Sequence, residues 1–158
     1  TQGNIELGIV GGGTEEYMSS LEELVEDLEL GKRITLLGYI PHNELPETLH
    51  KYHVGVSPLP DIESFQVSSP AKVYEYLAMG FPVVASSMQA HEKILKDGVD
   101  SLLYPVGDEE ELADQLDRLS DDQELWHMLS SNARTKAEAN DWFTRYQSVK
   151  RVIKSESR

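Results

Sequence analysis

Short apolar runs alternate with segments of helical periodicity along this 158-residue chain. The runs have the length of buried strands, and Gly, Pro or polar residues lie at their ends. Strands that alternate with helices favour a parallel sheet covered by helices on both faces, so the expected fold class is α/β. The predicted strands span residues 5–10, 34–37, 54–57, 82–85 and 101–104, and the predicted helices span residues 15–30, 43–52, 70–79, 89–96, 108–119, 122–138 and 142–155.

Length and composition fit one compact domain. A 158-residue chain with 39% hydrophobic residues can form one core and is short for two domains that each have a core of their own. It has no cysteine, which excludes disulfides and thiolate metal sites and agrees with a reducing compartment, so we expect a cytoplasmic location. No apolar run reaches the roughly eighteen residues of a membrane span, and no secretion signal is present. Because the chain begins at Thr1, we expect that it was cut from a longer protein.

Acidic residues dominate the charge. The formal net charge of −14 argues against nucleic acid as a partner, because binding to phosphates needs broad basic patches, and solubility is its simplest interpretation. The segment 141–158 is net positive, with basic residues at Arg145, Lys150, Arg151, Lys154 and Arg158. The helix dipole alone favours basic residues near a helix C-terminus, and a partner surface or an anionic membrane is the alternative.

The segment 68–85 is the strongest candidate for chemistry. Ser69 is a good N-cap and Pro70 suits the first helical position. Lys72 then lies in the first turn, where the helix dipole disfavours a cation unless an anion is bound. Glu75 follows on the same face, so the pair could hold a phosphorylated sugar or a nucleotide. A weak exposed ion pair between Lys72 and Glu75 would explain the same spacing.

The carboxyl ends of the predicted strands define the expected site. Ligands of open parallel sheets bind in the crevice at these ends. The stretch 58–68 has no clear periodicity, and long loops in compact domains are often functional. The loops expected to meet at the crevice are 11–14, 38–41, 58–68, the start of the helix after Ser69, and 86–91.

Other patterns have simpler explanations. The run Gly11–Gly12–Gly13–Thr14 lacks the lysine of a phosphate-binding loop, so a strand-to-helix turn is favoured. His50 and His53 could share a helix face, but no third metal ligand is near. The sequence contains no Gly-x-Ser-x-Gly nucleophile elbow, so a catalytic triad is unsupported. The apolar and aromatic residues of the segment 68–85 are expected to be core: Tyr74, Tyr76, Leu77, Met79 and Phe81.

The segment 68–85 resembles a family signature. Its pattern is Ser69-Pro70-x-Lys72-x-x-Glu75-Tyr76-x-Ala78-x-Gly80-x-Pro82-Val83-Val84-Ala85, which is similar to the donor-site signature of retaining family-4-type glycosyltransferases with the GT-B fold. Residues 9–13, 33–41 and 97–108 resemble the other landmarks of that family in the same order.

The resemblance implies a place within a larger enzyme. Such enzymes have two Rossmann-like domains, and residues 1–158 resemble the second, nucleotide-sugar-binding domain, with helices on both faces of its sheet. The family's second domain opens with a strand and a loop whose Arg and Lys hold the diphosphate. We therefore expect the first strand and helix to be missing here. Residues 141–158 are expected to form a terminal helix on the absent N-terminal, acceptor-binding domain.

The resemblance also implies roles for single residues. Glu75 would accept hydrogen bonds from the ribose hydroxyls, and Lys72 with the N–H groups after Ser69 would face the diphosphate. The family's second Glu, eight residues before Glu75, is replaced by Val67, and Glu63 or Asp61 could take over the contact to the sugar. No residue is assigned as catalytic with certainty, and the donor-binding set is Gly12, Gly38, Tyr39, Ile40, Phe65, Gln66, Val67, Ser68, Ser69, Ala71, Lys72 and Glu75.

The implied reaction transfers a sugar from a nucleotide-diphosphate sugar to an acceptor, with retention at the anomeric carbon. No metal and no cofactor are expected, because this fold stabilises the leaving group with basic side chains and helix N–H groups. The fragment alone is expected to bind nucleotide weakly and to turn nothing over, and a peripheral membrane contact would come through the full-length protein. Two alternatives stay open: a GT-B-like nucleotide-sugar epimerase or hydrolase, and a non-catalytic nucleotide-binding or interaction domain.

Overall fold

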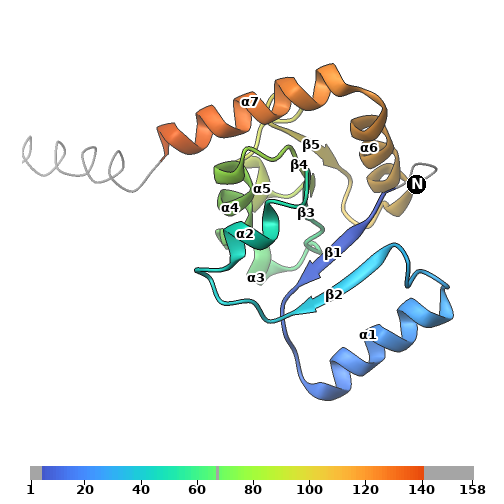
Figure 1. Ribbon diagram of the computed structural model, residues 1–158. Helices are drawn as coiled ribbons and strands as arrows, with labels where there is room; N and C mark the ends of the chain where they lie inside the picture. The colour runs from blue at the N-terminus through green and yellow to red at the C-terminus, as the bar shows by residue number, and fades with distance from the viewer. Residues whose placement is uncertain (1–4, 67, 141–158) are drawn as a thin grey trace, which may run out of the picture. The chain divides into compact units, whose positions relative to one another are not determined.

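The computed structural model describes residues 5–66 and 68–140 (Figure 1). The predicted helix at 142–155 and Val67 lie outside the described residues. The chain divides into two compact units, the first ending at Tyr52 and the second beginning at His53. The expectation of one domain over residues 1–158 stays a prediction.

The first unit is built on two parallel strands. It contains β1 (Leu7–Val10), α1 (Glu15–Asp27), β2 (Ile34–Gly38) and α2 (Leu45–Leu49). The strands β1 and β2 pair in parallel, with Leu7 opposite Ile34. Thr14 caps α1 as expected, because its hydroxyl oxygen accepts the Tyr17 N–H at 3.2 Å.

The second unit holds a three-stranded parallel sheet in the order β3–β4–β5. Its strands are β3 (Gly55–Ser57), β4 (Val83–Ser86) and β5 (Ser101–Tyr104). Its helices are α3 (Glu63–Gln66), α4 (Ala71–Met79), α5 (Gln89–Glu92), α6 (Glu109–Asp121) and α7 (Gln123–Ala139) (Figure 1).

The central strand β4 is buried on both faces. Val83 and Ala85 pack with Val73 and Leu77 of α4 in one cluster, which also includes Ala133 of α7. On the opposite face, Val84 packs in a second cluster of buried residues with Leu102, Tyr104, Leu119 and Leu129. This alternation follows from the two-residue period of a strand, and a strand covered on both sides must be continuously apolar. The α/β fold with parallel strands and helices on both faces is confirmed.

Three local expectations about the elements are wrong. The stretch 58–68 is not entirely irregular, because α3 forms within it. The helix expected at 89–96 is only α5, since the chain tightens after it and the Ile94 and Leu95 N–H groups both donate to the His91 carbonyl. The first long helix ends at Asp27 and not at Gly31, because Glu29 takes the left-handed conformation with φ 56°.

Candidate functional site

The start of α4 lies on Pro70, one residue later than expected. Pro70 is the N-cap with φ −67° and ψ 100°, and it provides no side-chain hydrogen bond to the helix. The prediction of Ser69 as N-cap is therefore wrong, because Pro70 stays extended instead of joining the first turn. The first N–H groups of a helix have no intrahelical partner, and here no capping side chain takes one of them. These N–H groups are of the kind that binds an anion.

Lys72 lies in the first turn of α4, as the sequence predicts. Its side chain is half-buried, and burial lowers the pKa of its amino group. No hydrogen bond or ion pair joins Lys72 to another residue within 5–66 and 68–140. An anionic ligand at this place would favour the charged amine and the helix N-terminus at once.

Glu75 lies one turn after Lys72 and is half-exposed. Its charge is the second cause, after burial, of the raised pKa of the Tyr76 phenol. The structure has no ion pair between the Lys72 amine and the Glu75 carboxylate, both of which it describes. An exposed ion pair between Lys72 and Glu75 therefore does not explain their spacing.

The body of α4 is fixed by its neighbours in the second unit. Gly55 of β3 allows close contact, because a Cβ atom there would lie 2.3 Å from ring atoms of Tyr76. At the other end of α4, the Ser130 hydroxyl donates to the Gly80 carbonyl and the Arg134 guanidinium donates to the Ala78 carbonyl, each at 2.7 Å. Lys72 and Glu75 thus stand on a rigid element, which is what a binding site needs.

The 58–68 loop is partly ordered by its own side chains. The Gln66 amide donates to the Asp61 carboxylate, and the Ser68 hydroxyl donates to the Phe65 carbonyl at 2.8 Å. Phe65 is half-buried, whereas Glu63 is exposed in the first turn of α3. Of the two carboxylates considered as replacements for the acid expected at 67, Asp61 is engaged within the loop.

In the first unit, the expected donor-binding residues lie together at the carboxyl ends of β1 and β2. The Gly11 N–H donates to the Gly38 carbonyl at 2.9 Å, and Gly38 has the left-handed φ of 64°. A Cβ atom at Gly12 would lie 3.6 Å from the Cβ of Tyr39. Tyr39 is 80% exposed and Ile40 is half-buried.

The structure adds a buried polar network that the sequence analysis missed. His91 Nδ1 donates to the Ser86 carbonyl at 2.7 Å, so its Nε2 accepts the Ser57 hydroxyl at 2.9 Å. The Ser86 hydroxyl donates to the Leu59 carbonyl at 2.7 Å. Ser57, Ser86 and His91 are each 0% exposed. The only signal in the sequence was a serine at the end of each of two buried strands, followed by a histidine in the next turn.

Burial lowers the pKa of the His91 imidazole. The hydrogen bond to the Ser86 carbonyl opposes this effect, and the positive charge of Lys72 adds to it. Burial therefore favours the neutral form of the imidazole, and the positive charge of Lys72 favours the neutral form further.

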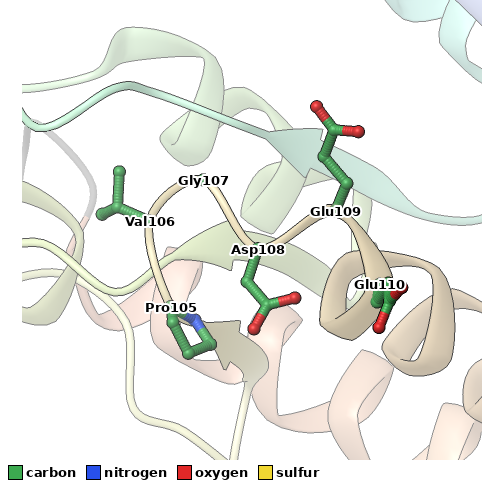
Figure 2. Close-up of a pocket in the computed structure, with 6 residues that line it drawn as sticks. All are labelled: Pro105, Val106, Gly107, Asp108, Glu109 and Glu110. Carbon is green, nitrogen blue, oxygen red and sulfur yellow. The ribbon is translucent and has the colours of Figure 1, made fainter.

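A pocket of about 440 Å³ follows the turn from β5 to α6 and is shown in Figure 2. Its lining includes the carboxylates of Asp108, Glu109 and Glu110. A neighbouring pocket of about 430 Å³ shares Asp108 and Glu109 and includes Pro58 and Leu59. These carboxylates would repel a diphosphate, so neither pocket replaces the start of α4 as an anion site.

Two further expectations concern a metal site and a membrane span. His50 is the C-cap of α2 and His53 lies outside the helix. Within the described residues, no group of three or more His, Asp or Glu side chains is arranged to hold a metal ion. None of the described helices is long and apolar enough to cross a membrane.

The matching family model and the two relatives named next describe glycosyltransferases. The family described as "Glycosyl transferases group 1" matches residues 1–136. An alpha-D-kanosaminyltransferase from Streptomyces kanamyceticus is 29% identical over 113 residues, which are 72% of this chain and 28% of that protein. A UDP-Gal:alpha-D-GlcNAc-diphosphoundecaprenol alpha-1,3-galactosyltransferase from Escherichia coli is 30% identical over 129 residues, which are 81% of this chain and 31% of that protein.

Solved structures share the fold. The crystal structure of Anabaena Alr3699/HepE in complex with UDP and glucose matches with a TM-score of 0.79 at 22% identity, over 95% of this chain and 40% of that chain. This chain therefore spans well under half the length of each of these three proteins.

Proposed function

Because this chain belongs to the glycosyltransferase group 1 family, we propose that it is the nucleotide-sugar-binding part of a longer glycosyltransferase. The observation that carries the proposal is the start of α4, where the half-buried Lys72 lies beside uncapped helix N–H groups and Glu75 lies one turn further on. Lys72 and these N–H groups would hold the donor diphosphate, and Glu75 would accept hydrogen bonds from the ribose hydroxyls.

The remaining donor contacts are proposed from the family resemblance, for each unit by itself. The backbone at Gly12, Gly38 and Ile40, with the exposed Tyr39, would meet the base. The segment from Phe65 through Ser69 to Ala71 would approach the sugar and the diphosphate, and Glu63 is the exposed carboxylate of this loop that could contact the sugar. The matched HepE structure contains UDP and glucose, which supports a uridine diphosphate sugar as the first donor to test.

The proposed reaction breaks the bond between the anomeric carbon and the diphosphate and forms a bond from that carbon to an acceptor hydroxyl oxygen. The hydroxyl proton is released, and the diphosphate leaves with its negative charge stabilised by Lys72 and the helix N–H groups. We propose retention at the anomeric carbon, which nuclear magnetic resonance of the product would decide.

Other proposals concern the longer protein. The matched stretches are 28% and 31% of the two curated relatives, which supports an acceptor-binding domain in another segment of the same protein. Closure of two domains on both substrates would be needed for turnover, so we propose that this chain alone is inactive. A role in glycan biosynthesis in the cytoplasm, with peripheral membrane contact through the longer protein, completes the proposal.

Calorimetry with UDP tests the site directly. We expect the parent chain to bind UDP weakly and Lys72→Met to bind about tenfold more weakly or worse, because a hydrogen bond to a charged group is lost. Glu75→Gln should weaken UDP and leave inorganic diphosphate binding nearly unchanged, since Glu75 addresses the ribose. GDP and ADP, measured in parallel, would identify the base.

Matched exposed residues of the same unit provide the controls. Lys93→Met removes an exposed lysine after α5, and Glu124→Gln removes an exposed carboxylate in the first turn of α7. Both should bind UDP as the parent does. Equal UDP affinity in the parent, Lys72→Met and Glu75→Gln would contradict the proposed donor site.

A further inference from the structure

The network around His91 connects three separate parts of the second unit. Ser57 is the last residue of β3, Ser86 is the last residue of β4, and His91 lies in α5. The Ser57 hydroxyl and the Leu59 carbonyl flank the first residue of the 58–68 loop, and both are bonded into the network. Side-chain hydrogen bonds thus attach the start of this loop to the end of β4 and to α5, next to the last sheet pair of Ser57 with Ala85.

The pair of Ser57 and His91 has the spacing of a nucleophile and its base, with 2.9 Å between Oγ and Nε2. Both side chains are 0% exposed, however, so a substrate cannot reach the Ser57 oxygen. The arrangement is also directed inward, because Nδ1 donates to a backbone carbonyl of the same network. These contacts fit a role in holding the loop and not a role in covalent catalysis.

We propose that His91, neutral and with its proton on Nδ1, is a positioning residue of the donor site. It would hold the start of the 58–68 loop in the conformation that binds the donor, acting through Ser57 and Ser86. The proposal rests on the proposed function, because it concerns the same site. It adds a residue that touches no substrate and that connects the ends of β3 and β4 to the start of the loop.

Protonation of His91 would disturb this arrangement in two ways. Nε2 would become a donor and could no longer accept the Ser57 hydroxyl, whose hydrogen would lose its acceptor in a buried place. A second positive charge would also arise near Lys72 of α4. Other charged side chains on neighbouring elements include Glu75 of α4 and Glu63 of the adjacent α3. They also include Glu92 of α5, which accepts the Ser87 hydroxyl at 2.6 Å, and Lys93 after it.

Nitrogen-15 resonances of the imidazole test the protonation state without any ligand. We expect the Nδ1–H tautomer for His91 and no protonation while the pH falls through about 6.5, the usual histidine pKa. The spectrum of His91→Asn assigns the signal. An Nε2–H tautomer, or protonation of His91 already at a pH of about 6.5 or above, would overturn the proposal.

Variants then test the coupling to the ligand. His91→Phe fills the space but removes both hydrogen bonds, and we expect UDP to bind about tenfold more weakly, as for the loss of one or two buried hydrogen bonds. Hydrogen exchange at the backbone amides of residues 59–66 should become faster. His91→Asn can still donate from its amide to the Ser86 carbonyl and should recover part of the affinity. His127→Phe is the control and should leave both measurements unchanged.

The outcomes separate this inference from the proposed function. If the parent and a folded His91→Phe bind UDP equally, the positioning role is wrong and the donor site stands. If the parent does not bind UDP, the proposed function is contradicted, and hydrogen exchange alone then decides whether His91 holds the loop. Ser57→Ala, which removes only a hydroxyl, replaces His91→Phe if that variant does not fold, and equal UDP affinity and exchange in Ser57→Ala would reject the role of the network.

Discussion

Two helices of this chain end in the same hydrogen-bond pattern, one on a glycine and the other on a glutamate. After α4, the Gly80 N–H donates to Leu77 and the Phe81 N–H donates to Tyr76, with Gly80 at φ 74°. After α1, the Glu29 N–H donates to Glu26 and the Leu30 N–H donates to Val25, with Glu29 at φ 56°. Both ends are Schellman motifs, in which the left-handed residue is usually glycine.

The two left-handed positions should respond oppositely to substitution. Glu29→Gly should raise the free energy of unfolding by about 1 kcal/mol, because the left-handed conformation is costly for a residue with a Cβ atom. Gly80→Ala should lower it by about 1–2 kcal/mol for the same reason. The cost at Gly80 lies in the backbone, since its Cβ would meet no atom closer than 3.8 Å. Urea unfolding measures both, and a stabilised Gly80→Ala would contradict the assignment.

Among the elements, α7 connects several separate parts of the second unit. Besides its bonds to the end of α4, its Lys136 amine donates to the Ile94 carbonyl at 2.7 Å and its Asn132 amide donates to the Val99 carbonyl at 2.8 Å. Lys136 also pairs with the Asp100 carboxylate, which is almost fully buried and accepts the Lys96 N–H at 2.8 Å. The helix thereby fixes the turn between α5 and β5.

Loss of the Asp100 charge should destabilise this turn. Asp100→Asn should lower the free energy of unfolding by about 1–3 kcal/mol, because the half-buried Lys136 loses its anion and Lys96 loses a charged acceptor. Glu138→Gln in the exposed Arg134–Glu138 pair is the control and should change it by less than about 0.5 kcal/mol. Equal urea midpoints and slopes for Asp100→Asn and the parent would show that the buried pair contributes nothing.

For the whole molecule, the charge distribution decides how an anionic donor can bind. The net charge of −14 repels a diphosphate, so attraction must come from local groups such as Lys72 and the start of α4. If these groups suffice, UDP affinity should be the same in EDTA and in millimolar Mg²⁺. Calorimetry of the parent chain under both conditions measures this, and an increase of about tenfold or more with Mg²⁺ would indicate that a divalent cation joins the site.

A comparison of the predicted and the observed elements shows which helices and strands are determined by the local sequence. Alternating apolar runs and the acidic first turns of α1 and α6 were sufficient to place nearly every described strand and helix, and Gly80 ended α4 where expected. The end of α1 was missed because a glutamate occupies a position where the sequence signal is a glycine. The start of α4 was missed by one residue because Pro70 can be either extended or helical at a helix N-terminus.

The sequence by itself determined the α/β class, the family resemblance, and the position of Lys72 and Glu75 on one face of a short helix. These features depend on residues close to each other in the chain, whose spacing can be read directly. Only the tertiary structure decided that Lys72 is half-buried, that it makes no ion pair with Glu75, and that His91 is bonded to Ser57 and Ser86. Burial and hydrogen bonds between distant segments depend on which strands and helices come together, and residue spacing does not encode that.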